Sequence, residues 1–275
     1  MTILVTGARG NVGRRVLQGL YAAGHSLRAS GRNPAELDVP AGVETVALDL
    51  NDPETFVAAL AGVSKVLLYA EPDGIVKFLD EAEKAGVEKV VLLSSSTVGT
   101  PGDPLAHHHE VAEQAVVASG LTYTLLRPGA FMSNAFGWSY SLKAGDTIDQ
   151  VFPEAQIAPV HEDDIADVAV VALTESSLDG ETVVLSGPES LTFRRQLEIV
   201  GEVLGRTLVI NTLSREEGEA QMSNFVPPPV LASLLAQWEA AVGVTADTSA
   251  TAERVTGKPA RTFRQWVEEH SAFLA

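Results

Sequence analysis

The sequence predicts an α/β fold: a doubly wound parallel sheet followed by a smaller, mainly helical C-terminal lobe. Six short apolar runs before residue 130 are separated by segments with helical periodicity. These runs are nearly continuous, as in parallel strands buried on both faces, and do not alternate with polar residues. A glycine-containing turn joins the first run to the first helix, as in a unit of two parallel strands with a helix between them.

The elements can be assigned in order along the chain. We expect the first six strands at residues 3–5, 26–30, 43–48, 65–69, 89–93 and 121–126. Helices are expected from residue 13, after Asp52, and at 74–85 and 105–119. Past residue 131 the pattern is less regular, with helices expected at 163–173, 193–204, 230–242 and 261–273 and strands at 157–160 and 182–185. We predict a nucleotide-binding domain over 1–130, to whose sheet later elements are added, and a substrate-binding lobe over 131–275.

The turn after the first strand carries Gly7, Gly10 and Gly13. Glycines at these places allow a sharp turn, a close approach of backbone N–H groups to a diphosphate, and tight packing of helix on strand. The same spacing also occurs in ordinary tight turns. Its position between a strand and an amphipathic helix favours a Rossmann-type dinucleotide site.

The end of the second strand indicates which dinucleotide is bound. NAD-binding versions of this unit place an acidic residue there, to bind the ribose hydroxyls. This chain has Ser30-Gly31-Arg32-Asn33, and its first acidic residue, Glu36, comes after the expected turn. Arginine pairs with an adenosine 2′-phosphate, so we predict NADP(H), with Arg32 as the main contact and Arg9 as the second.

Charge is unevenly distributed. Residues 1–35 contain five arginines and no acidic residue, whereas the whole chain has a net charge of −17. We interpret the local excess as binding an anion with more charge than a diphosphate, with Arg14 and Arg15 assigned to a solvated helix face. The strongly acidic balance argues against nucleic acid as a partner.

Composition also bounds the class of protein. The 275 residues are 45% hydrophobic, which fits a globular protein, and the absence of cysteine excludes disulfides and thiolate chemistry. No apolar run is long enough to span a bilayer, and the N-terminal residues do not read as an export signal. We expect a cytoplasmic protein that is not bound to a membrane. Monomer and homodimer both remain open.

Further motifs give the chain a family resemblance. With the glycine turn, the segments 94–98, 121–134, 159–166 and 257–263 make it similar to the NmrA-like group of atypical short-chain dehydrogenases/reductases, especially its NAD(P)H:quinone oxidoreductase branch. The resemblance covers most of the chain. It is specific for fold and nucleotide binding and much less so for the reaction.

The resemblance implies cofactor contacts at matching positions. The diphosphate loop would comprise Gly7, Arg9, Gly10, Asn11, Val12 and Gly13, with Arg32 at the phosphate-discriminating position and Asp49 and Leu50 beside the adenine. Along the nicotinamide half it would place Tyr69, Ala70, Ser94, Ser95, Pro128 and Phe131.

One departure from the family concerns catalysis. Many relatives carry a Tyr-x-x-x-Lys pair in which the lysine lowers the tyrosine pKa, so that the phenol protonates a carbonyl. Here these positions fall on Leu105 and His109. His109 is our candidate replacement, as a proton donor or as a hydrogen-bond donor to the cofactor ribose. The alternative is a solvated residue at a helix start. Ser96 matches a carbonyl-binding hydroxyl, or else caps the strand end.

Two other features allow opposing interpretations. The run His107-His108-His109 does not predict a metal site, because consecutive helical residues point about 100° apart. Aromatic and apolar residues after residue 130 are consistent with a substrate pocket and a lid, or with ordinary core packing: Phe131, Met132, Phe136, Trp138, Tyr140, Met222, Phe225 and 227–229.

Hydride transfer without the tyrosine suits an acceptor that is already electrophilic. We therefore expect an NADPH-dependent oxidoreductase that reduces a small organic acceptor, such as a quinone, an enone or an imine or iminium, with an apolar or cationic substrate. The alternative is a non-catalytic NADP(H) sensor that acts through a partner protein.

Overall fold

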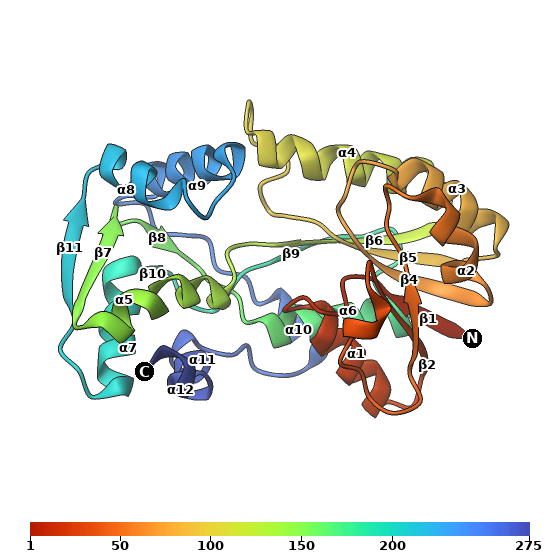
Figure 1. Cartoon of the computed structure of the whole chain (residues 1–275), viewed down its shortest axis with the longest axis horizontal. Coiled ribbons are helices and arrows are strands. Elements are labelled where there is room, and N and C mark those ends of the chain that lie inside the picture. Colours follow the sequence, from red (N-terminus) through yellow and green to blue (C-terminus); the bar gives the residue numbers. More distant parts are fainter.

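The computed structural model describes residues 1–275, which form a larger part built on one sheet and a smaller lobe beside it (Figure 1). The sheet has seven strands in the order β3-β2-β1-β4-β5-β6-β9, and every neighbouring pair is parallel. The strands are β1 (Thr2–Val5), β2 (Ser26–Gly31), β3 (Glu44–Ala47), β4 (Val63–Tyr69), β5 (Lys89–Leu93), β6 (Thr122–Pro128) and β9 (Thr182–Leu185).

Helices cover both faces of the sheet. One face packs against α1 (Gly13–Ala22), α6 (Glu162–Thr174) and α10 (Thr251–Thr256) in a core of 23 buried residues. The other packs against α2 (Phe56–Leu60), α3 (Ile75–Lys84) and α4 (Pro104–Ala118) in a core of 18. Short 3-10 turns precede β3 and α2, as η1 (Pro34–Glu36) and η2 (Pro53–Thr55). The predicted doubly wound parallel sheet is confirmed.

Burial on both faces explains why the strands read as unbroken apolar runs. All five residues of β5 are buried, including Lys89 at its start. The Lys89 ammonium donates hydrogen bonds to the carbonyl oxygens of Ala172, at 2.9 Å, and Glu175, at 2.6 Å. These carbonyls lie at the C-terminus of α6, where the helix dipole favours a cation, and the ammonium also pairs with Asp179, so the buried charge is compensated.

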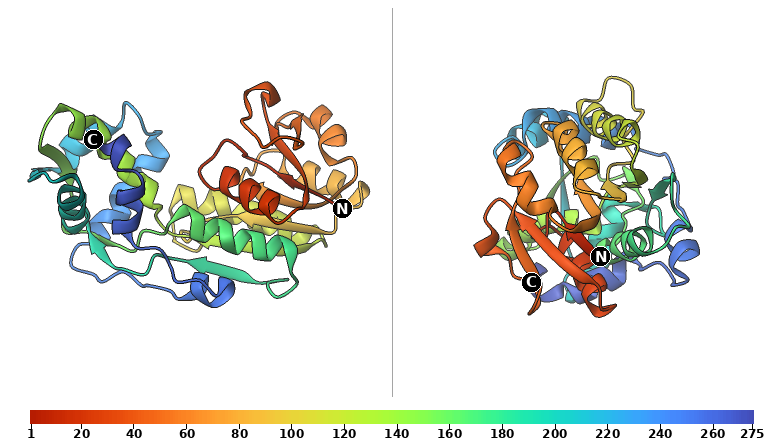
Figure 2. Two further views of the ribbon diagram at one scale, coloured as in Figure 1. Left: turned by 90° about the horizontal axis from the view of Figure 1, so that it is seen from below. Right: turned by 90° about the vertical axis from the view of Figure 1, so that its right-hand side faces the viewer.

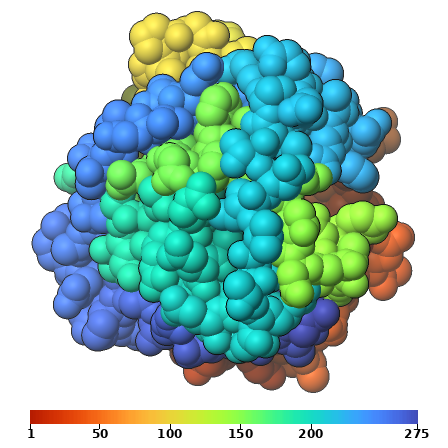
Figure 3. All heavy atoms as spheres, turned by 90° about the vertical axis from the view of Figure 1, so that its left-hand side faces the viewer, coloured from red at the N-terminus to blue at the C-terminus, as the bar shows by residue number.

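The smaller lobe is mainly helical, as predicted, with two small two-stranded sheets, of which the sequence predicted one strand, at 157–160. β7 (Thr147–Val151) pairs with β11 (Val209–Leu213) in parallel, and β8 (Gln156–Ile157) pairs with β10 (Leu191–Thr192) in antiparallel fashion. The helices are η3 (Met132–Trp138), α5 (Ser139–Ala144), α7 (Phe193–Leu204), α8 (Arg215–Met222), α9 (Pro228–Ala240), α11 (Phe263–Glu269) and α12 (Ser271–Leu274). In the space-filling view from that end, these later segments make up most of the face (Figure 3).

The chain passes between the two parts more than once. After η3 to β8 have been built into the lobe, α6 and β9 return to the sheet, and α10 does so again near the C-terminus (Figure 2). Elements after residue 131 therefore occur in both parts of the molecule. None of the helices combines the length and the hydropathy needed to cross a bilayer.

The strand order reverses between β1 and β4. In doubly wound sheets, ligands bind outside the carboxyl ends of the strands at this switch point. The ends of these two strands are fixed together here, because the Tyr69 N–H donates a hydrogen bond to the Thr6 hydroxyl at 3.2 Å. The glycine turn after β1 and the turn after β4 thus meet at the expected ligand edge.

Candidate cofactor and active site

The glycine turn is shaped by close backbone contacts. A Cβ atom on Gly13 would lie 2.3 Å from the carbonyl oxygen of Gly7, so only glycine lets α1 begin this close to β1. Gly7 has a φ of +59°, and the Gly10 N–H donates to its carbonyl at 2.8 Å. No side chain within the helix caps the first N–H groups of α1, and its first turn has no acidic residue. A helix start of this kind binds anions.

The Tyr69 side chain packs directly on this turn. A Cβ atom on Gly7 would lie 2.5 Å from Tyr69 Cε2, and one on Gly10 would lie 2.9 Å from the phenol oxygen. The backbone N–H groups of Gly13 and Val12 are directed at that oxygen and act to lower its pKa. Burial raises the pKa of Tyr69 above its ordinary value, by more than these groups lower it, so the phenol is neutral at neutral pH.

The end of β2, where the adenosine half of a dinucleotide would lie, carries both signs of charge. Arg32 is exposed and forms no ion pair. Arg9 forms a 2.5 Å ion pair with Glu36, which also accepts a 2.7 Å hydrogen bond from the Asn33 amide. No local pattern in the sequence indicated that Glu36 reaches back to the glycine turn.

The five arginines of residues 1–35 do not form one anion site, which corrects our interpretation of the charge excess. Arg28 is buried, pairs with Glu44, and donates to the carbonyl of Ala59 at 2.8 Å. Arg15, expected on a solvated face, is largely buried and pairs with Asp163 at the start of α6, at 2.6 Å. Arg14 is exposed, as expected.

Asp49 and Leu50, the residues predicted to lie beside the adenine, follow β3. The side chain of Asp49 accepts the Asn51 N–H at 3.0 Å, and a Cβ atom on Gly74 would lie 1.7 Å from the Leu50 carbonyl oxygen. Gly74 has a φ of +79°, which few other residues adopt. The turns after β3 and β4 are therefore in contact, next to the predicted adenine side.

The three serines after β5 have different surroundings. Ser94 is buried and donates its hydroxyl to Glu113 at 2.5 Å, while the Ser95 hydroxyl accepts the Thr97 N–H at 3.2 Å. Ser96 is exposed, and its N–H donates to the Pro128 carbonyl at 2.9 Å. The Ser96 hydroxyl forms no hydrogen bond within the protein, so its O–H is free to donate to a ligand.

A buried ion pair lies under this edge. Glu113 on α4 receives two hydrogen bonds from the Arg127 guanidinium, at 2.9 and 2.5 Å, in addition to the one from Ser94. Its side chain is 6% exposed. This network joins α4, β5 and β6, and it fixes the helix that carries His109 one turn earlier.

His109 has a strongly shifted pKa. Burial and the neighbouring His108 lower its pKa from 6.5 to about 4, against the opposing effect of Glu113. The Nδ1 atom is buried and has no hydrogen-bond partner. His108 instead contacts the Ala70 carbonyl through Nε2 at 3.0 Å. At neutral pH, His109 is thus a neutral imidazole with one buried ring nitrogen that has no partner in the protein.

A second unpartnered group was not anticipated. The Ser186 hydroxyl, directly after β9, is buried and has no hydrogen-bond partner. The preceding carbonyl, of Leu185, accepts the Gly129 N–H at 2.8 Å, so Ser186 follows the strand that lies beside Pro128 and Phe131. Sequence reasoning missed it because β9 joins the sheet from far along the chain.

Most of the aromatic residues proposed for a pocket belong to the core of the lobe. Met132 is buried, Phe136 packs against Trp266 with ring centroids 4.8 Å apart, and Trp138 donates its indole N–H to Gln150 at 2.9 Å. Tyr140 is 85% exposed. For the buried residues, the core-packing alternative describes the structure.

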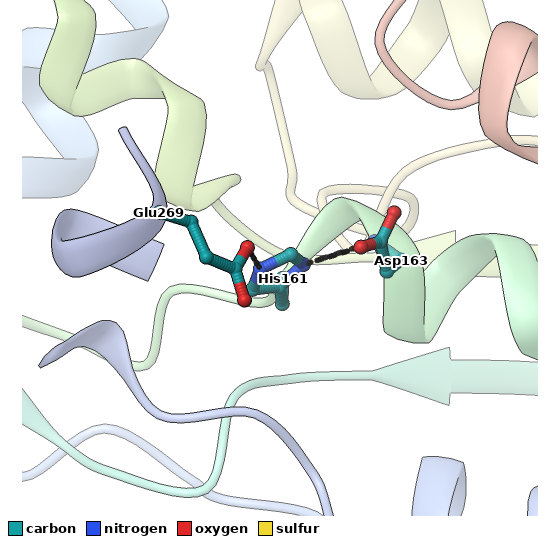
Figure 4. A group of neighbouring side chains, drawn as sticks. All are labelled: His161, Asp163 and Glu269. Carbon is teal, nitrogen blue, oxygen red and sulfur yellow. Dashed lines mark hydrogen bonds and ion pairs between the residues drawn. The ribbon is translucent and has the colours of Figure 1, made fainter. Parts of the chain in front are cut away.

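His161, Asp163 and Glu269 form the one compact group of potential metal ligands (Figure 4). The Nδ1 atom of His161 accepts the Asp163 N–H at 3.0 Å, and its Nε2 atom lies 3.2 Å from Glu269. The two carboxylates therefore flank opposite edges of one imidazole, and both of its nitrogens have partners in the protein. The arrangement caps α6 and ties α11 to it.

Taken together, the edge of the sheet fits a dinucleotide. The three glycines leave room that a Cβ would fill, the start of α1 presents N–H donors, and two buried polar atoms, His109 Nδ1 and Ser186 Oγ, have no protein partner. Fold and site together define a Rossmann-type dinucleotide-binding protein.

The particular family follows from comparison with known proteins. Residues 7–176 match the NAD(P)H-binding family, to which the chain belongs. The chain is 36% identical to the (4-alkanoyl-5-oxo-2,5-dihydrofuran-3-yl)methyl phosphate reductase of Streptomyces griseus, over 99% of both chains.

Two solved structures are also similar over nearly their whole length. One is triphenylmethane reductase of a Citrobacter species, which is 26% identical to this chain. The two structures align with a TM-score of 0.85 over 98% of this chain and 99% of the reductase chain. The NADPH-dependent quinone oxidoreductase of Escherichia coli, 25% identical, has a TM-score of 0.83 and covers all of both chains. The expected membership of the NmrA-like group of NAD(P)H-dependent oxidoreductases is confirmed.

Proposed function

We propose that this protein is an NADPH-dependent reductase of a small, electron-poor organic acceptor: a quinone, an enone, or an imine or iminium. The observation that carries the proposal is the make-up of α4. The family's tyrosine position falls on Leu105, and His109, four residues on, is neutral with a pKa of about 4. Without a strong acid at this place, the acceptor itself must be electrophilic enough to take a hydride.

NADPH, when bound, supplies the hydride. The chain's own residues would hold the cofactor through the glycine turn and the N–H groups of Val12 and Gly13, with Arg32 pairing with the 2′-phosphate. Ser94, Ser95, Pro128 and Phe131 would flank its nicotinamide half. His109 Nδ1 and the hydroxyls of Ser96 and Ser186 would then orient polar atoms of the acceptor or cofactor.

The named activities of similar proteins support an electron-poor acceptor. They include a quinone oxidoreductase, a triphenylmethane dye reductase and a reductase of a phosphorylated, carbonyl-substituted dihydrofuranone. These acceptors share an electron-deficient centre rather than a shape.

The charges of the lobe favour an apolar or cationic acceptor over a phosphorylated one. Every arginine and lysine after residue 131 pairs with a carboxylate, except Lys143 and Arg254. Lys143 lies over the Phe273 ring at 4.7 Å, and Arg254 donates to the Thr251 hydroxyl. Few cations thus remain for a phosphate. A cytoplasmic location remains part of this proposal.

The test combines cofactor titration with an acceptor panel. We expect NADPH to bind at least tenfold more tightly than NADH, and Arg32→Ala to remove most of that difference, whereas Arg14→Ala, the matched exposed control, leaves it unchanged. Turnover is then measured with a naphthoquinone, an α,β-unsaturated ketone and a cyclic iminium. Tight NADPH binding without turnover of any acceptor would instead support a non-catalytic sensor.

A further inference from the structure

Tyr69 lies where the glycine turn opens toward the ligand edge. Its ring covers Gly7 and Gly10 so closely that a Cβ atom on either would lie under 3.0 Å from it. The residue is half-buried and packs against the core formed with α1 and α6. The two glycines therefore provide space for a phenol ring in the present structure.

The hydroxyl of Tyr69 lies at the anion-binding end of α1, 2.9 Å from the position of a Cβ atom on Gly10. The N–H groups of Gly13 and Val12 are directed at it and lower its pKa, and no capping side chain of the helix competes for them. In dinucleotide-binding folds, N–H groups at this helix start bind the diphosphate. A phenol oxygen and a phosphate oxygen cannot accept the same N–H groups from the same place.

We propose that Tyr69 is a gate for the cofactor: its side chain and the diphosphate compete for the N–H groups of Val12 and Gly13, so the cofactor binds after the phenol has rotated away. The inference rests on the dinucleotide binding contained in the proposed function. In the closed conformation, the Tyr69 ring covers Gly7 and Gly10 and lowers the apparent affinity for NADPH. Tyr69 would therefore oppose cofactor binding instead of contributing to it.

The surrounding backbone allows this movement without loss of the fold. The Tyr69 N–H is held by the Thr6 hydroxyl at 3.2 Å, and the Ala70 N–H donates to the Leu93 carbonyl at 3.3 Å. The end of β4 is therefore anchored on both sides, and rotation about the side-chain bonds alone moves the ring. Apparent affinity then equals intrinsic affinity multiplied by the fraction of molecules in the open conformation.

The test measures NADPH affinity by fluorescence titration, separately from turnover. Tyr69→Phe keeps the ring and removes the phenol oxygen, and we expect about threefold tighter binding; Tyr69→Ser removes the ring as well, and we expect about tenfold. Tyr21→Phe is the matched control, because the Tyr21 hydroxyl bonds to the Ala41 carbonyl at the surface, and its affinity should equal that of the unaltered protein.

Rapid-mixing kinetics provide the second readout. Because side-chain rotation is fast, the association rate constant should be scaled by the open fraction: about tenfold larger in Tyr69→Ser than in the unaltered protein, with the dissociation rate constant unchanged. Equal or weaker NADPH binding by Tyr69→Phe overturns the gate, even if Tyr69→Ser fails to fold. Tighter binding by the variants with no turnover supports the gate and overturns the reductase, whereas NADPH binding by none of the proteins overturns both.

Discussion

The Ser233 hydroxyl donates a 2.6 Å hydrogen bond to Asp103 Oδ2, and this contact joins the lobe to the nucleotide-binding part. Ser233 is buried on α9, and Asp103 is the residue that caps α4, through N–H groups of Leu105 and Ala106. Gln237, one turn further along α9, donates to the same oxygen at 3.3 Å. In Figure 1, the two helices lie along the same edge of the molecule. The helix that carries His109 is thus held by the smaller lobe.

Removing the Ser233 hydroxyl should loosen this connection. A hydrogen bond to a carboxylate contributes about 1.5 to 3 kcal/mol, so Ser233→Ala should lower the free energy of unfolding by about that amount. It should also raise KM for the acceptor more than it lowers kcat. The control is Ser223→Ala, whose exposed hydroxyl bonds to the Ala220 carbonyl. Urea unfolding curves that coincide for the two variants would contradict this role of the contact.

The same contact should make stability depend on pH. Burial alone would raise the pKa of Asp103, but hydrogen bonds from Ser233, from the backbone of Ala106 and Leu105, and from Gln237 outweigh it and lower the pKa below 3.8. Stability from this carboxylate is therefore fully present above pH 3.8 and is lost as the pH falls through the lower folded-state value.

Asp103→Asn isolates that contribution. The variant should be less stable than the unaltered protein. The difference between their free energies of unfolding should be constant near neutral pH and shrink as the pH falls below 3.8. The measurement is chemical denaturation of both proteins across this range. A difference that grows on acidification would mean that the carboxylate is destabilising in the folded state.

His109 should act as a neutral imidazole. Because its pKa is about 4, His109 does not change its protonation state between pH 5 and 8, and its titration should cause no change in kcat over this range. His109→Leu should lower kcat/KM about tenfold to a hundredfold, the effect of one lost hydrogen bond to bound ligand, and His107→Leu, exposed on the same helix, should not. A fall in kcat above pH 6.5 that disappears in His109→Asn would show that the imidazolium is the acid.

The glycine turn should tolerate no side chain at Gly13. Gly13→Ala would place Cβ against the Gly7 carbonyl, at 2.3 Å, so the turn must open and NADPH affinity should fall by about a hundredfold or more. Gly137→Ala is the matched control, because nothing lies within 4 Å of its added Cβ. Calorimetric titration compares the two, and equal affinities would show that the turn does not bind the cofactor.

The sequence predicted those parts of the site that follow from local pattern. The six strands, the glycine turn and the serines after β5 depend on residues close together in the chain, and the parallel sheet brings their ends to one edge. Tyr69 over the turn, Ser186 after β9 and Ser233 against Asp103 depend on contacts between distant segments, which periodicity does not encode. β7 and β11 escaped prediction because they form a small, partly exposed pair with many polar residues.

The charge pattern shows the same limit. A run of arginines without acidic residues indicated a single anion site, but Arg28 and Arg15 pair with carboxylates of β3 and α6. Their partners lie 16 or more positions away, so composition within a window could not identify them. Arg32 is exposed and forms no ion pair, and its contact with a 2′-phosphate stays a prediction.

The central claim, hydride transfer from NADPH to an electron-poor acceptor, is tested most directly by a single-turnover measurement. The protein is mixed with less than one equivalent of NADPH and then with a naphthoquinone, and the absorbance of the reduced nicotinamide is followed. We predict complete loss of that absorbance in one phase, slowed by deuterium at one of the two C4 positions and not by deuterium at the other. Bound NADPH whose absorbance persists with the quinone, the enone and the iminium alike would contradict it.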